Sequence, residues 1–270
     1  MSTLLENIGP YSLVRNLSNT PGGTSYKAER DGEGFLIKVW LMGATYTQDV
    51  EHFEAEMASC KTVSPHVLHV LETGEFTTPR AAGKHLFTVQ PYRRPLTRHP
   101  YWPKEPFKAP TAPARDKSKK GLMKLLEGRP KEVVGDTRDR FRLFRTIVEA
   151  LAELPEPPPV TAERVFLADD GTVLWDPVGV PTFLPRASQE QTRAAEFRWP
   201  EAPASIENSP TVATWYLGVL GFALLADGVP KEQSDRYYRQ NEWPHRLREY
   251  DPSYPRSLDD LIADMLSLDD

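Results

Sequence analysis

Alternating apolar and polar residues mark the first ninety positions of the chain as a region of β-strands. The segment FLIKVW (35–40) shows the pattern best, because it alternates and is rich in β-branched and aromatic side chains. The turn-rich stretch SNTPGG separates the first two strand candidates, and DGEG precedes the third. Five strands are expected, at 11–17, 24–29, 35–40, 67–76 and 84–92.

A three- and four-residue repeat of apolar positions interrupts these strands and dominates the rest of the chain. Over 47–63, apolar side chains recur on one face of a predicted helix, with Glu56 at the edge of that face. The segment 164–176 instead predicts a hairpin, because two apolar runs flank the turn pair Asp170 and Gly171. Further helices are expected at 121–128, 139–154, 212–226 and 257–268.

Composition and charge describe an ordinary globular chain. It has 39% hydrophobic and 26% charged residues, and its formal charge of −5 gives no general attraction to nucleic acid or anionic lipid. The single cysteine, Cys60, excludes an internal disulfide and a zinc site of paired cysteines. The first residues lack the pattern of a signal peptide, and the apolar segment 212–226 is shorter than the roughly 20 residues of a membrane span. We therefore expect a soluble, cytoplasmic protein without a membrane partner.

Proline is the one unusual component, with 26 residues in the chain. Seven of them fall within 91–113, which predicts extended or irregular backbone there. The same region continues into a Lys-rich stretch, ARDKSKKG. We therefore expect a Pro/Lys-rich insertion at 93–120, between a strand-rich region at 1–92 and a helical region at 121–270.

The order of these parts, a sheet with one inserted helix followed by helices and one small hairpin, resembles the protein kinase fold. LIKV (36–39) resembles the strand motif whose lysine contacts the phosphates of ATP, and FEAE (53–56) resembles the helix that carries the glutamate partner of that lysine. VFLADDGTVLWD resembles the hairpin that leads to the metal-binding aspartate. The resemblance is to bacterial-type Ser/Thr protein kinases and spans roughly residues 10–268. Three later segments also resemble the family: WPEA (199–202), WYLGVLGFALLADGVP (215–230) and YDPSYPRSLDDLIADML (250–266).

This resemblance implies an α+β, bilobal fold, with a five-stranded antiparallel sheet and one helix in the N-lobe and a mainly helical C-lobe. It nominates Lys38 and Glu56 as the ion pair beside ATP, and Asp176 as a ligand of Mg²⁺. It also implies a structural ion pair between Glu201 and Arg256. The remaining nucleotide contacts that it implies are Gly22, Gly23, Val89 and Gln90.

The positions that act on the substrate in the family depart from its pattern. Pro157, Pro158 and Pro159 occupy the place of the family's His-Arg-Asp sequence, and a proline side chain cannot accept a proton. The second metal ligand of the family is replaced by Arg164, whose guanidinium has no lone pair for Mg²⁺. A positive group there would also repel the metal unless its side chain turns away. Two glycines of the nucleotide-covering loop are replaced as well.

Each nominated residue also has an ordinary structural interpretation. Lys38 and Glu56 can fix the position of a helix against the sheet without any nucleotide. Asp176 follows a hairpin, where aspartates often turn the chain, and Gly22 with Gly23 is a turn signal. Apolar packing explains the two predicted adenine-pocket positions nearly as well as ligand binding does.

The sequence therefore predicts a degenerate kinase-like domain, a pseudokinase that regulates or scaffolds a protein partner and retains at most weak binding of ATP with Mg²⁺. The alternative is an ATP-dependent Ser/Thr protein kinase, or another phosphate or nucleotidyl transferase, with a rearranged site. Glu156 or Glu163, beside the proline run, would then supply the carboxylate that orients the attacking hydroxyl. A nucleic-acid-associated protein acting through 104–131 is a third hypothesis, and the scarcity of aromatic residues there argues against it.

Overall fold

The computed structural model divides the chain into two compact units. The first comprises Met1–Pro95 and Glu163–Arg198, and the second comprises Leu96–Ala162 and Trp199–Asp270. The first unit is therefore assembled from two segments that are distant in sequence. The residues described by the structure are 6–20, 23–41, 46–60, 64–77, 84–103, 131–154, 160–179, 211–228 and 246–267.

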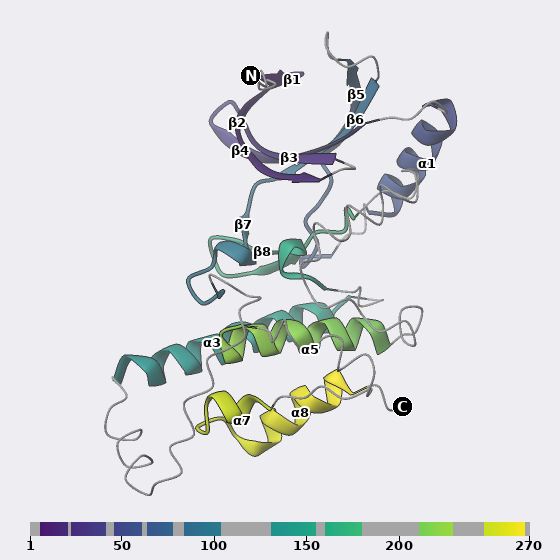
Figure 1. Cartoon of the computed structure of the whole chain (residues 1–270). Helices are drawn as coiled ribbons and strands as arrows, with labels where there is room; N and C mark the ends of the chain where they lie inside the picture. Colours follow the sequence, from purple (N-terminus) through teal and green to yellow (C-terminus); the bar gives the residue numbers. More distant parts are fainter. Residues whose placement is uncertain are drawn as a thin grey trace, which may run out of the picture. The chain divides into compact units, whose positions relative to one another are not determined.

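An antiparallel sheet forms most of the first unit (Figure 1). Within the described residues it has six strands in the order β1-β2-β3-β4-β6-β5. The expected antiparallel sheet is confirmed, but the sequence missed β1, because two residues are too few to show alternation. The strands are β1 (Asn7–Ile8), β2 (Tyr11–Thr20), β3 (Gly23–Arg30), β4 (Glu33–Leu41), β5 (Glu72–Thr77) and β6 (Lys84–Pro91).

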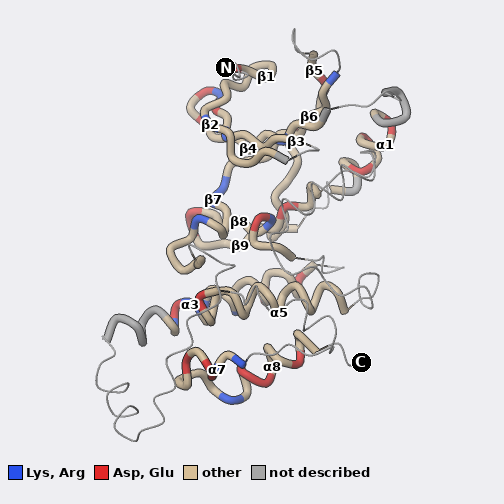
Figure 2. The backbone as a smooth tube through the Cα atoms, viewed as in Figure 1, with Lys and Arg blue, Asp and Glu red and all other residues tan. Residues whose placement is uncertain are grey.

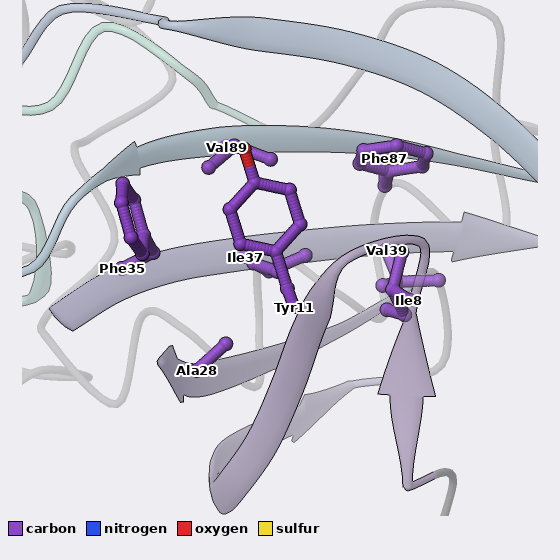
Figure 3. Packing of buried hydrophobic residues seen from close by; sticks show 8 residues of the cluster. All are labelled: Ile8, Tyr11, Ala28, Phe35, Ile37, Val39, Phe87 and Val89. Atoms are coloured by element: carbon purple, nitrogen blue, oxygen red, sulfur yellow. The ribbon is translucent and has the colours of Figure 1, made fainter. Parts of the chain in front are cut away.

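Alternation along β4 and β6 gives the sheet two different faces. On one face, Ile37 and Val89 are paired in register and belong to an interior cluster around the ring of Tyr11 (Figure 3). The opposite face carries Lys38, so the pleat alone separates the lysine from this cluster. The interior cluster consists of Ile8, Tyr11, Ala28, Phe35, Ile37, Val39, Phe87 and Val89.

Tyr11 links its own strand, β2, to β5, the last strand in the sheet order. Its hydroxyl donates a hydrogen bond to Glu72 Oε2 on β5 at 2.6 Å and accepts one from Arg30 Nη1 at 2.8 Å. Because β2 and β5 lie far apart in the strand order, this contact requires a strongly curled sheet. Burial, followed by the hydrogen bond to Glu72, raises the pKa of Tyr11 to about 12.

The raised pKa of Tyr11 predicts a loss of stability at high pH. The unfolded tyrosine ionises near pH 10, whereas the folded one keeps its proton until about pH 12. Its contribution is therefore complete below pH 10 and is lost as the pH rises from 10 to 12. We expect the Tyr11→Phe variant to lose less free energy of unfolding than the parent across this window in urea titrations. Tyr250, whose pKa is also raised to about 12, is present in both proteins and cancels in the comparison.

One helix and one small sheet complete the described first unit. Helix α1 (Tyr46–Ser59) confirms the helix predicted after β4, although it ends four residues earlier than expected. The predicted hairpin forms β8 (Val165–Leu167) and β9 (Val173–Trp175), with Gly171 in its turn at φ 87°. A short strand, β7 (Arg94–Pro95), pairs with β8 and makes a three-stranded sheet.

The described part of the second unit is helical. Helix α5 carries no charged residue along its whole length (Figure 2), and it contacts both α3 and α8. The predicted helix at 121–128 lies outside the described residues. In the described part of the chain, no helix combines the length and apolar character needed to cross a membrane. The helices are η1 (Leu96–Arg98), α3 (Lys131–Ala152), η2 (Ala162–Arg164, at the boundary of the units), α5 (Thr211–Ala226), α7 (Leu247–Tyr250) and α8 (Arg256–Leu266).

Candidate functional site

The hairpin β8–β9 places Asp176 in the first unit by pairing with the segment that precedes β5. Trp175 N donates to His66 O at 2.7 Å, and Leu68 N donates to Trp175 O at 2.8 Å. Asp176 follows β9 directly, so these main-chain bonds fix the position of its Cα. The pairing also explains why the strand predicted at 67–76 begins only at Glu72, since residues 66–68 bond to β9 instead.

Lys38 and Asp176 form a buried ion pair. Lys38 is in β4, between Ser25 of β3 and Thr88 of β6. Its Nζ lies 2.5 Å from Asp176 Oδ2 and also donates to Val178 O at 2.5 Å. The side chain of Asp176 is 1% exposed. The lysine nominated for phosphates and the aspartate nominated for metal are thus brought together and bind each other.

The second oxygen of the Asp176 carboxylate also has two donors. Gln90 Nε2 donates to Asp176 Oδ1 at 2.9 Å, and Val178 N donates to the same oxygen at 3.0 Å. The same Gln90 Nε2 donates to Leu68 O at 3.0 Å. The carboxylate therefore receives three donors in total, counting Lys38, and its negative charge is largely compensated within the protein.

Arg164 binds the main chain that follows β9. Its Nε donates to Asp176 O at 3.0 Å and its Nη2 donates to Pro177 O at 2.8 Å. The guanidinium also lies over the ring of Trp175, with Cζ 4.8 Å from the centroid. The side chain predicted to replace the family's second metal ligand is thus held against main-chain carbonyl oxygens and an indole ring.

Val178 connects the residues after Asp176 to helix α1. It is 1% exposed and belongs to an apolar cluster with Phe53 and Met57 of α1. Cys60, just past the end of α1, makes a weak Sγ–H contact to Pro177 O at 3.7 Å. We call residues 176–179 the Asp176 segment. Hydrogen bonds from Arg164 and the apolar packing of Val178 both hold this segment in place.

Apolar side chains also fill the region beside Lys38 on its face of the sheet. Leu36, two residues before the lysine, is buried in a cluster with Leu68 and Phe166. Leu17 and Tyr92 are among the partly buried residues that pack against this cluster. This cluster therefore lies on the same face of β4 as the lysine.

The remaining residues nominated from the sequence are not established as contacts of Lys38 or Asp176. Glu56 is half-buried on α1, and its ion pair with Lys38 stays a prediction. Val89 faces the interior cluster, on the opposite side of the sheet from Lys38. A Cβ on Gly23 would lie 2.6 Å from Val39 O, so this glycine permits close packing of β3 on β4. Gly22, Glu156, Pro157, Pro158, Pro159 and Glu201 lie outside the described residues, and Arg256 is the exposed first residue of α8.

Sequence reasoning nominated Gln90 for the adenine pocket and missed its bonds to Leu68 and Asp176. Two polar residues that alternate with apolar ones in the second half of the strand were the available signal, because Thr88 and Gln90 share one face of β6. Both side chains are fully buried, and Thr88 Oγ1 and Gln90 Oε1 have no hydrogen-bond partner.

Comparisons with known proteins identify the fold. No protein-family model matches the sequence, and no curated protein matches it either. Two crystal structures of the Mycobacterium tuberculosis PknI kinase domain, a single and a double mutant, are similar to the chain with TM-scores of 0.54 and 0.55. Each is 17% identical and covers 99% of this chain and 92% of its own length. The chain has a protein-kinase-like fold. At this identity, the similarity establishes the fold alone.

The kinase fold generally binds ATP with Mg²⁺, and the residues present do not fit the metal in the described arrangement. Mg²⁺ requires oxygen ligands with free lone pairs. Asp176 directs its oxygens at three protein donors, and the position predicted from the sequence for the second ligand carries Arg164. Among the described residues, no group of three or more His, Cys, Asp or Glu side chains could hold a metal ion.

Proposed function

We propose that this protein is a pseudokinase, a kinase-like domain without phosphoryl-transfer activity that regulates or scaffolds a protein partner. Phosphoryl transfer requires a bound triphosphate, metal ligands and a carboxylate that orients the attacking hydroxyl. Lys38 and Asp176 bear on the binding of the triphosphate and the metal, and residues 157–159 bear on the orienting carboxylate.

The ion pair between Lys38 and Asp176 is the observation that supports the proposal most. A lysine that neutralises a carboxylate at 2.5 Å offers little charge to a phosphate, and the same carboxylate offers little charge to a metal. The apolar cluster of Leu36, Leu68 and Phe166 on the lysine's face of the sheet supports the proposal further, because its side chains pack on one another next to the strand position of the lysine.

The sequence around the expected catalytic loop agrees with this interpretation. Pro157, Pro158 and Pro159 provide no carboxylate and no donor, so they supply neither a base nor a ligand. Without these groups, the protein would act by binding a partner through its surface. We propose that the partner is a protein, recognised through the face of α1 or through the Pro/Lys-rich insertion, and that nucleotide binding is weak at most.

An assay of phosphate transfer tests the proposal directly. Purified protein, incubated with labelled ATP, either Mg²⁺ or Mn²⁺ and generic protein substrates, should incorporate no label above that of a Lys38→Met control. The lysine variant is the matched control because it removes the strand lysine that the resemblance places on the phosphates. Incorporation that disappears in Lys38→Met would show an active kinase.

A transferase with a rearranged site is the second candidate, and the position of Glu163 favours it. Glu163 precedes Arg164 in η2, and Arg164 binds the main chain of Asp176 and Pro177. A carboxylate is therefore present in the same short helix as a residue of the site. If the assay detects transfer, Glu163→Gln should abolish it on this hypothesis, and Asp176→Asn should be equally harmful.

A further inference from the structure

The orientation of the Gln90 amide is fixed by its partners. Leu68 O and Asp176 Oδ1 can only accept hydrogen bonds, so the amide nitrogen must face both of them. The amide oxygen consequently points away from these groups and has no donor, although the side chain is fully buried. Gln90 therefore leaves one of its own polar atoms unpaired while it binds Asp176.

Packing alone does not explain an amide at this position. An apolar side chain of the same size would fill the space without a buried, unpaired oxygen, which is unfavourable. What the amide adds is a donor for Leu68 O and for Asp176 Oδ1. Because Oδ2 is occupied by Lys38 and Oδ1 also accepts from Val178 N, the amide of Gln90 completes the set of donors around the carboxylate.

We propose that Gln90 is a latch that keeps Asp176 from serving as a metal ligand. The inference rests on the proposed function, since it explains how the kinase-like site excludes Mg²⁺, but it concerns metal binding and not catalysis. Gln90 is a positioning residue in this view, because it acts through the carboxylate of Asp176. A metal ion can use Oδ1 only if the amide leaves, and the second acceptor at Leu68 O holds the amide in place.

The experiment compares Gln90→Met with the parent protein and with Thr88→Val. Methionine keeps the length and volume of glutamine and removes the donor. Thr88 is two residues away on the same face of β6, is equally buried and has an unpaired hydroxyl, so Thr88→Val is a matched control for changing a buried polar residue. Binding of Mn²⁺ in the presence of ATP is measured by electron paramagnetic resonance for all three proteins.

We expect Gln90→Met to bind Mn²⁺ about tenfold more tightly than the parent, in line with the loss of one hydrogen bond to a charged group. Thr88→Val should bind it as weakly as the parent does. A folded Gln90→Met protein with unchanged affinity for Mn²⁺ would overturn the inference. Equal gains in Gln90→Met and Thr88→Val would do so too, since the effect would then come from loosened packing.

A measurement on the parent protein keeps the inference testable if Gln90→Met does not fold. The thermal shift produced by ATP should be the same with and without Mg²⁺, because Asp176 is not available to the metal. A larger shift with Mg²⁺ would overturn the latch. Failure of the proposed function would appear separately, as phosphate transfer in the labelled-ATP assay.

Discussion

Replacing Asp176 by asparagine should lower the free energy of unfolding by about 3 kcal/mol or more, the cost of breaking a buried ion pair from one side. Asp176 is 1% exposed and Lys38 only 16% exposed, so water cannot replace the lost carboxylate. The ammonium group would remain beside a neutral amide and the carbonyl of Val178. Urea unfolding followed by circular dichroism measures the effect.

The matched control for this substitution is Asp260→Asn in α8. Asp260 pairs with Arg246 at 3.2 Å, but both side chains are about half exposed, and such pairs contribute at most about 1 kcal/mol. The double variant Lys38→Met with Asp176→Leu should recover much of the loss, because well-packed apolar side chains often replace a buried pair without cost. An Asp176→Asn protein as stable as Asp260→Asn would contradict the buried pair.

A second large effect is expected for Val178→Asp, with a loss of about 4 kcal/mol or more from lost apolar burial and an unpaired buried charge. Val178 is 1% exposed and packs with Phe53 and Met57 of α1. Its carbonyl accepts from Lys38, so the substitution disturbs both α1 and the ion pair. Thermal unfolding should show either a much lower midpoint or no cooperative transition.

Val14→Asp is the control for this prediction, because Val14 is also in the first unit and is 52% exposed. It should change the free energy of unfolding by less than about 1 kcal/mol. If Val178→Asp remains folded, hydrogen exchange should be faster at the amides of α1 than in the parent. Unchanged exchange in α1 would mean that the Asp176 segment does not support this helix.

The sequence was a good guide where a single periodicity governs an element. Helix α5 was expected at 212–226 and spans Thr211–Ala226. An apolar run of this length is too long for a single buried strand, so a buried helix was the expected structure. Strand β4 extends by two residues before and one after the expected 35–40. The start of β5 was wrong by five residues, because residues 66–68 bond to a hairpin that follows a hundred residues later.

Three residues of the candidate site, Lys38, Gln90 and Asp176, were nominated from the sequence, but the bonds among them were not predicted. Lys38 and Asp176 were found because their flanking motifs resemble those of a known family. Nothing local to Gln90 indicates that its amide binds Asp176, since the two residues are 86 positions apart and meet only when the hairpin has paired. The alternation of Thr88 and Gln90 with apolar residues in β6 was the one local sign.

The two-segment composition of the first unit has a consequence for protein synthesis. The interior cluster uses residues 8–89 only and can form early. The cluster that contains Phe53 and Met57 also needs Val178, and the cluster that contains Leu36 and Leu68 also needs Phe166. Residues 96–162 must leave the ribosome before these two clusters can close, which takes several seconds at about 5–20 residues per second. During that time Trp40 and Phe53 lack Val178, and Leu36 lacks Phe166. We expect the nascent chain to bind chaperones that recognise exposed apolar surface during this interval.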